Sequence, residues 1–206
     1  MSARRAAVPR RLVLGGAAAL GGCSLLPKPA YVQRFVWPLV VRRPTVRPPR
    51  TGGKVLMVRE IRPGPGLDQA GVQWLRADGS LHVDFYNQWA VPPAEGITDD
   101  LRRWLAGSGL FSAVVGSDSG LTPDLVLEGE VTTFLGDPAQ RQAQAALAIV
   151  LMGARGDPTR VLLQRTVAAT APLGANTPAG VVAGVLAALR TILGGTETAL
   201  RPFTGR

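Results

Sequence analysis

The chain has 206 residues, of which 46% are hydrophobic, and it carries a formal net charge of +9 and a single cysteine. This hydrophobic content is enough for a packed core and excludes a wholly disordered chain. One cysteine excludes a disulfide framework, so the folded part must be held by packing alone. The basic excess is concentrated before the first acidic residue, Glu60, and no zinc-finger or aromatic RNA-binding signature accompanies it. Composition therefore favours a basic segment near an anionic membrane over a nucleic-acid partner.

The N-terminal stretch has the pattern of a secretory signal. Arg10 and Arg11 precede an uncharged apolar run, Leu12–Leu20, which ends in small residues before Cys23. A positive start, a short apolar middle and a small-residue end are typical of a cleavable signal. The run is well short of the ~20 residues that a transmembrane helix needs. Residues 1–22 are therefore predicted to be a signal peptide.

The end of this signal, Leu20-Gly21-Gly22-Cys23, resembles the lipobox of bacterial lipoproteins. The resemblance implies diacylglycerol on the Cys23 sulfur, cleavage between Gly22 and Cys23, and acylation of the new amino group, for instance with palmitate. Ser24 resembles the residue that follows the cysteine in lipoproteins sorted to the outer membrane. The alternative is ordinary signal cleavage beside an unmodified cysteine. The arginine pairs also resemble a twin-arginine signal.

Residues 23–53 are rich in proline and arginine and are predicted to form a lipidated tether. Within it, Tyr31–Val41 has enough aromatic and β-branched residues for one strand. Pro38 would keep that strand at a sheet edge, because proline lacks an amide hydrogen to donate.

Beyond the tether, short apolar or alternating runs bounded by turn residues predict strands. Asp78-Gly79 lies between two such runs and predicts a tight hairpin, because glycine tolerates the positive φ of the turn. The predicted strands are 54–61, 71–76, 81–85, 110–115, 124–134, 142–152 and 159–169.

Two helices are predicted. Pro92-Pro93 opens the first, whose apolar face includes Ile97, Leu101 and Trp104, and glycines from Gly107 onward end it. Thr177-Pro178 supplies an N-cap and a first residue for the second helix. Its apolar face comprises Val181, Val182, Val185, Leu186, Leu189 and Leu193. Residues 54–203 are therefore predicted to form one α+β domain, with a mixed or antiparallel sheet built from hairpins and two long helices packed on it.

No set of residues in the sequence supports an enzyme. The single histidine, His82, lies on a predicted strand, and no Gly-x-Ser-x-Gly motif supplies a nucleophile for it. Adjacent Asp99 and Asp100 would point about 100° apart on a helix, so we assign them to the helix start, where carboxylates favour the dipole. Glu128 and Glu130 are interpreted as a solvated strand face. We therefore expect no catalytic residues, no metal and no cofactor.

Several short sequence motifs occur in an order that resembles the ABC-type transport auxiliary lipoprotein family. These are the Pqi-type lipoproteins that accompany MCE-domain lipid transporters. The resemblance covers roughly residues 54–203 and includes an opening VLMV strand and a strand pair before an apolar last helix. The residues that carry the family motif, in structural or partner-facing roles, are Leu67, Asp68, Tyr86, Trp89, Pro92, Gly109, Phe111 and Asp124.

The resemblance implies a non-enzymatic lipoprotein on the periplasmic side of the cell envelope, anchored in the outer membrane through acylated Cys23. Its implied partners are an MCE-domain protein with an ABC permease and ATPase, and phospholipid is a further candidate ligand. Docking would use the sheet edge or the first helix, and a homo-oligomer is compatible with this role. The alternatives are a direct lipid carrier, with an acyl chain between sheet and last helix, and a structural envelope lipoprotein.

Overall fold

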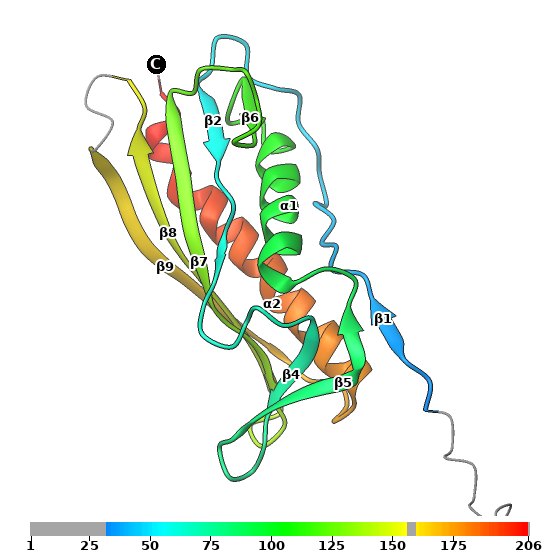
Figure 1. The fold of residues 1–206 in the computed structure, drawn as a ribbon. Coiled ribbons are helices and arrows are strands. Elements are labelled where there is room, and N and C mark those ends of the chain that lie inside the picture. Colours follow the sequence, from blue (N-terminus) through cyan, green and yellow to red (C-terminus); the bar gives the residue numbers. More distant parts are fainter. Residues whose placement is uncertain (1–31, 156–159, 206) are drawn as a thin grey trace, which may run out of the picture. The chain divides into compact units, whose positions relative to one another are not determined.

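The computed structural model describes residues 32–155 and 160–205, and its sheet has nine strands (Figure 1). The predicted signal peptide, its cleavage position at Gly22 and the lipid-bearing Cys23 lie outside the described residues. From Gln33 onward the chain forms one unit. Its elements are β1 (Phe35–Trp37), β2 (Val55–Val58), β3 (Arg62–Pro63), β4 (Gly71–Leu75), β5 (Leu81–Trp89), α1 (Pro93–Ala106), β6 (Ala113–Val115), β7 (Leu125–Asp137), β8 (Gln142–Gly153), β9 (Val161–Pro172), α2 (Pro178–Leu200) and a 3₁₀ turn, η1 (Arg201–Phe203).

Strand β7 joins the two halves of the sheet. Along one side it pairs over its whole length with antiparallel β8, which pairs in turn with β9. Along the other side three short strands follow one another parallel to it: β2 next to Leu125–Leu127, β3 next to Glu130 and Val131, and β4 next to Gly136. Strand β6 extends the sheet beyond β2, and β5 with β1 extends it beyond β4. The sheet is thus mixed, and the predicted α+β class is confirmed.

The hairpin predicted at Asp78-Gly79 is present, and β8 and β9 form a second one. The β4–β5 turn contains Gly79 at φ 81°, the conformation for which glycine was expected. The β8–β9 hairpin pairs eleven residues of each strand around a loop of which residues 156–159 are not described. The turn residues Arg62-Pro63-Gly64-Pro65-Gly66 predict the end of the strand 54–61, whereas Arg62 and Pro63 pair with β7 as the further short strand β3. Strand β6 is also shorter than the predicted 110–115.

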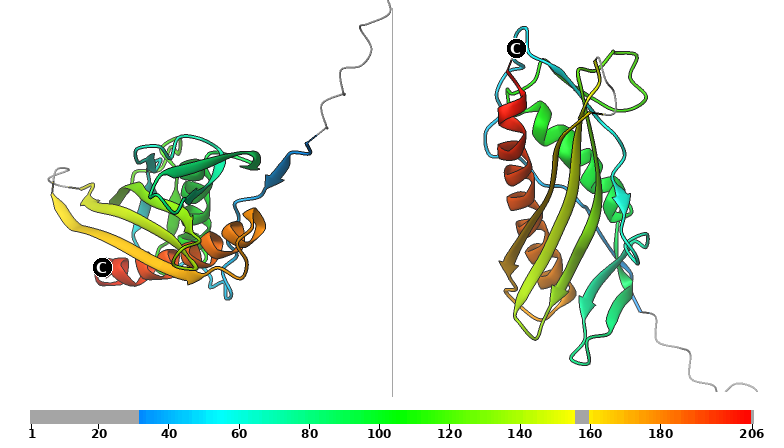
Figure 2. Two further views of the ribbon diagram at one scale, coloured as in Figure 1. Left: turned by 90° about the horizontal axis from the view of Figure 1, so that it is seen from below. Right: turned by 90° about the vertical axis from the view of Figure 1, so that its left-hand side faces the viewer.

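The two helices lie on the same face of the sheet, here called the inner face (Figure 2). Helix α1 begins after Pro92 and buries Ile97, Leu101 and Leu105, as the spacing predicted. Helix α2 begins after Thr177, whose hydroxyl accepts a hydrogen bond from the Gly180 amide at 3.1 Å, and packs against β7, β8 and β9. It is long and apolar enough to cross a membrane, yet half of its apolar stretch is buried. A core-facing position therefore accounts for its apolar residues.

The segment from Leu39 to Arg50, here called the strap, belongs to the folded domain. Leu39 and Val41 are buried, and the Val41 amide donates a hydrogen bond of 2.8 Å to the Asp100 carboxylate of α1. The Arg47 amide donates to the Gly107 carbonyl at the end of the same helix. The composition of residues 23–53 predicts a tether, whereas the folded unit begins at Gln33.

Candidate docking face

The face of β7, β8 and β9 that points away from the helices is here called the outer face. In β8, alternate side chains are fully buried beneath α2, among them Leu147, Ile149 and Leu151. The alternate side chains that point outward include the small Ala146 and Ala148 as well as the larger Gln144, Val150 and Met152. Figure 2 shows no helix over this face in the described part of the chain.

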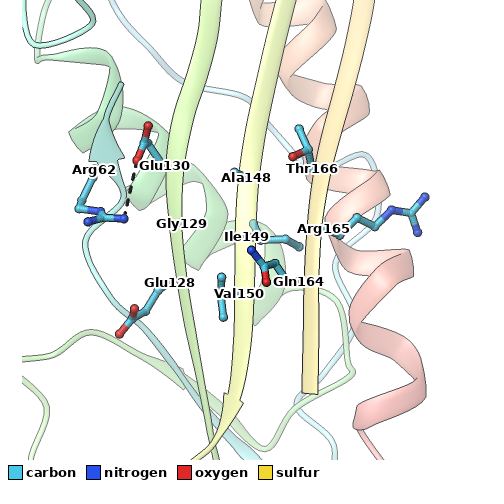
Figure 3. A pocket seen from close by; sticks show the side chains of 10 residues that line it. All are labelled: Arg62, Glu128, Gly129, Glu130, Ala148, Ile149, Val150, Gln164, Arg165 and Thr166. Atoms are coloured by element: carbon cyan, nitrogen blue, oxygen red, sulfur yellow. Dashed lines mark ion pairs between the residues drawn. The ribbon is translucent and has the colours of Figure 1, made fainter. Parts of the chain in front are cut away.

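The small side chains leave a shallow hollow of about 370 Å³ over β7, β8 and β9 (Figure 3). Gly129 and Ala148 lie in its middle, with Val150 nearby. A second hollow of about 340 Å³ continues along the same face around Ala146 and Ala168. The two hollows are together called the trough. Small side chains such as Ala146, Ala148 and Ala168 form part of its floor. Polar side chains, among them Gln144, Gln164 and Thr166, line the rest. Such a floor suits a protein surface that packs closely on it.

Charged pairs border this trough on the β2–β3 side. Glu128 forms an ion pair with Arg59, and the Glu130 carboxylate lies 3.7 Å from the Arg62 guanidinium. Both arginine side chains are largely exposed and both glutamates are partly exposed, so each pair contributes little to stability. The two glutamates, interpreted from the sequence as a solvated face, do share one face of β7. A rim of exposed opposite charges is typical of the border of an interface.

Strand β9 is an edge strand: among the described residues it pairs with β8 alone. Alternate backbone amide and carbonyl groups of an edge strand point away from the sheet and can pair with another chain. Charged side chains usually protect such edges, but β9 carries only Arg165 along its twelve residues. Its length and its few charges make it suitable for strand addition by a partner.

Helix α1, the other predicted docking element, is less accessible. The strap lies along it, with Leu39 so close that a Cβ at Gly96 would lie 3.1 Å from the leucine side chain. Arg43 of the strap donates hydrogen bonds to the Trp104 carbonyl and to Glu197 of α2. The strap thus already occupies part of the surface that α1 would present to a partner.

Glu197 is the centre of a buried polar cluster between α1, α2 and the strap. Its carboxylate pairs with the Arg43 guanidinium and accepts hydrogen bonds from the Trp104 indole at 2.9 Å and from Arg201 at 3.3 Å. Burial by itself raises the pKa of this carboxyl, but the hydrogen bonds from Arg43 and Trp104 outweigh burial and lower the pKa below its usual range. The cluster has all its main partners in place, so we assign it a structural role.

The motif residues fall into distinct structural positions. Leu67, Trp89 and Phe111 are buried in the core. Gly109, at φ 70°, follows α1 where a Cβ would come within 2.9 Å of Arg47 in the strap. Asp124 accepts a hydrogen bond of 2.8 Å from the Val55 amide and also pairs with Arg155.

The remaining motif residues, Asp68, Tyr86 and Pro92, are exposed. Pro92 precedes α1, and its carbonyl accepts a hydrogen bond from the Gly96 amide. Tyr86 lies on β5, which β4 separates from β7 in the sheet. The structure therefore does not bring the motif residues together into one site.

His82 is engaged by two neighbours. An Arg76 N–H donates to its Nδ1 at 2.8 Å, and its ring lies 4.3 Å from that of Trp74 between centroids. Among the described residues no group of three or more histidine, cysteine or carboxylate side chains is placed to hold a metal ion.

The sequence did not predict the trough on the outer face or the packing of the strap on α1. The signal for the trough was the number of alanines in β8. Their presence alone does not show whether they lie on the surface or in the core, and in the structure some lie in each. The strap depends on pairs such as Arg43–Glu197, separated by 154 positions, for which a single sequence carries no pattern.

Comparisons with known proteins give the family and the fold. Comparison with curated proteins returns no match. A crystal structure of a DUF330 protein from Xanthomonas campestris superposes with a TM-score of 0.68 at 23% identity, over 79% of this chain and 92% of that one. A crystal structure of an uncharacterised protein superposes with a TM-score of 0.63 at 17% identity, over 84% of this chain and 100% of that one. These likenesses show the shared fold. The family model described as the ABC-type transport auxiliary lipoprotein component matches residues 39–193, and the chain belongs to this family.

Proposed function

We propose that the protein is the periplasmic auxiliary lipoprotein of an ABC-type phospholipid transporter and docks an MCE-domain protein with the outer face and the β9 edge. Family membership supports the transport role and the lipoprotein class. The observation that carries the docking surface is the trough on the outer face, next to edge strand β9, which pairs only with β8 in the described part of the chain. In this proposal the protein acts by binding and performs no chemistry.

The anchor in this proposal is the acylated Cys23 in the outer membrane. One acyl chain holds a protein only marginally, at ~0.8 kcal/mol per buried methylene, whereas several chains on one residue hold it permanently. Replacement of Cys23 by serine is expected to abolish palmitate incorporation and to release the protein from the membrane fraction. Palmitate labelling and fractionation measure both effects, and an unlabelled wild-type chain would contradict the anchor.

Packing of α2 on the sheet argues against the direct lipid carrier. A Cβ at Gly136 would lie 2.7 Å from Val181 of α2, and one at Gly184 would lie 2.8 Å from Ala143 of β8. Side chains between helix and sheet, such as Leu189 and Leu193, are fully buried. Sheet and helix approach too closely along these positions to hold an acyl chain between them.

Photocrosslinking in cells tests the docking surface. A photoreactive amino acid at Gln164, exposed on the outer face of β9, is expected to crosslink to the MCE-domain protein. The matched control is Ala106, exposed at the end of α1, which is expected to give no such product. Crosslinks to the MCE-domain protein from position 106 and not from 164 would indicate docking through α1. Absence of the MCE protein from both products would contradict docking, and a self-crosslink from 164 would indicate a homo-oligomer through β9.

A further inference from the structure

Exposed aromatic side chains are concentrated where the chain enters the folded unit. Within the described residues, the aromatic side chains that remain largely exposed are Phe35 at 48%, Phe85 at 58% and Tyr86 at 41%. Val36 beside them is 65% exposed. These four residues and Arg34 are here called the aromatic patch. They come from β1, its preceding residue and β5, at the end of the molecule opposite the β8–β9 loop (Figure 1).

The patch is ordered by contacts among its members. Strands β1 and β5 run parallel, with Phe35 opposite Asn87. The Arg34 guanidinium lies 4.2 Å from the centroid of the Phe85 ring, a cation–π contact. The Phe85 and Tyr86 rings meet edge to face at 5.3 Å. The rings are thus held at the surface and do not fold back into the core.

The patch presents positive and apolar groups without an exposed carboxylate from its own strand. The one acidic residue of β5, Asp84, is buried, and its carboxylate accepts hydrogen bonds from the Tyr86 and Asn87 amides. No acidic residue occurs in the sequence before Glu60. Aromatic rings next to basic side chains are the combination found at the headgroup level of membranes, where ring faces enter the apolar boundary and cations meet anionic lipid.

The position of the patch relative to the lipid attachment point favours a membrane over a protein as its occupant. Residues 24–32 separate Cys23 from Gln33, where the folded unit begins. A fully extended chain of this length reaches about 30 Å, at most ~3.6 Å per residue. A lipid on Cys23 therefore keeps the patch within a short distance of the bilayer.

We propose that the aromatic patch inserts into the headgroup region of the membrane that holds the lipid anchor. This second contact sets the orientation of the domain. The ends of β7, β8 and β9 that are distant from the aromatic patch then point away from the membrane. The inference rests on the proposed lipidation of Cys23 for its location, but the affinity of the patch for lipid does not depend on the acyl chains.

Vesicle binding by the unlipidated mature chain, residues 23–206 with Cys23→Ser, tests the patch alone. The probe is a vesicle of phosphatidylethanolamine and phosphatidylglycerol, separated by sedimentation. Replacing Phe35 and Phe85 together by serine is expected to lower the partition coefficient about tenfold, since each ring contributes part of its apolar burial energy. Both side chains are exposed, so circular dichroism should show the same unfolding temperature for variant and parent.

The matched control is Val161→Ser, at the opposite end of the sheet, where the side chain is 53% exposed; it is expected to leave the partition coefficient unchanged. Equal binding of the double variant and the parent, or no binding by the parent, would overturn the proposal. Crosslinking of position 85 to a protein in place of lipid in cells would also overturn it. Palmitate labelling of the wild type is scored separately, so failure of the anchor and failure of the patch are distinguishable.

Discussion

At the scale of single residues, buried carboxylates connect segments that are distant in sequence. Asp100, assigned from the sequence to the start of α1, lies in its second turn, fully buried, and binds the Val41 amide and Arg103. Burial raises the pKa of Asp100 despite these two partners, whereas the pKa of Glu197 is lowered. As the pH falls toward these pKa values, protonation of Asp100 therefore favours the folded state, whereas protonation of Glu197 favours the unfolded state.

Glu197→Gln is expected to destabilise the protein by about 1–3 kcal/mol at pH 7, because the Arg43 guanidinium loses its buried partner. The folded-state pKa of Glu197 lies below the ordinary value of 4.5, so its stabilisation is fully present above pH 4.5 and is lost as the pH falls through the folded-state pKa. The difference between variant and wild type should therefore shrink in acid.

Urea unfolding followed by tryptophan fluorescence at pH 7 and at several values below 4.5 measures this difference. Exposed Glu60→Gln is the control and should show no comparable change. A gap between Glu197→Gln and wild type that stays constant with pH would contradict the assignment.

Asp124 provides a second prediction at this scale. Its carboxylate accepts a hydrogen bond from the Val55 amide at the start of β2, and its own amide donates to the Val55 carbonyl. Asp124→Ala leaves the Val55 amide without this acceptor and is expected to destabilise the protein by about 1–2 kcal/mol. Asp124→Asn keeps an acceptor oxygen and should destabilise it less. Thermal unfolding compares them; equal effects would assign the loss to the Arg155 pair instead.

At the scale of elements, the helices and hairpins could be predicted because their signals are local. Pro92, Thr177 and Asp78-Gly79 each mark a boundary through the chemistry of one or two residues. The end-to-end arrangement of β2, β3 and β4 along β7 could not be predicted, because parallel pairing depends on partners about 60 to 70 residues away. The same reasoning applies to the trough, because the outward position of Ala146 and Ala148 is defined only once β8 is placed between β7 and β9.

Helix α2 gives the prediction at this scale. Glycine in a helix is about 1 kcal/mol less favourable than alanine, yet Gly184 lies where a Cβ would come within 2.8 Å of Ala143 in β8. We expect Gly184→Ala to destabilise the protein by about 1–2 kcal/mol, because overpacking against a strand outweighs the gain in helix propensity.

Gly194 is the matched control in the same helix, because a Cβ there would meet only Trp104, at 3.9 Å. Gly194→Ala should be neutral or stabilising by up to ~1 kcal/mol. Adding Ala143→Gly to Gly184→Ala should recover part of the lost stability. Urea unfolding of the three variants checks the argument, and a stabilising Gly184→Ala would contradict it.

At the scale of the whole molecule, the strap makes the folded domain larger than the sequence suggested. A chain beginning at residue 54 would lack the buried Leu39 and Val41 and would leave Asp100 and Glu197 without the Val41 amide and Arg43. Two buried aliphatic side chains contribute about 3–6 kcal/mol, which is comparable with the whole stability of many domains.

We therefore expect a chain of residues 54–206 to be largely unfolded at 25 °C and a chain of residues 33–206 to unfold cooperatively. Circular dichroism on heating compares the two. Equal unfolding temperatures would show that the strap is dispensable and that the domain boundary predicted at residue 54 is correct.

Arg50 at the end of the strap and Lys54 beyond it both contact the segment that follows α2. Arg50 donates a hydrogen bond to the Thr204 carbonyl and Lys54 donates one to the Phe203 carbonyl, across 154 and 149 positions. Contacts of such long range form late, because the intervening chain must be complete before they exist. A chain that leaves a narrow pore N-terminus first could form these two contacts only after Phe203 and Thr204 had emerged.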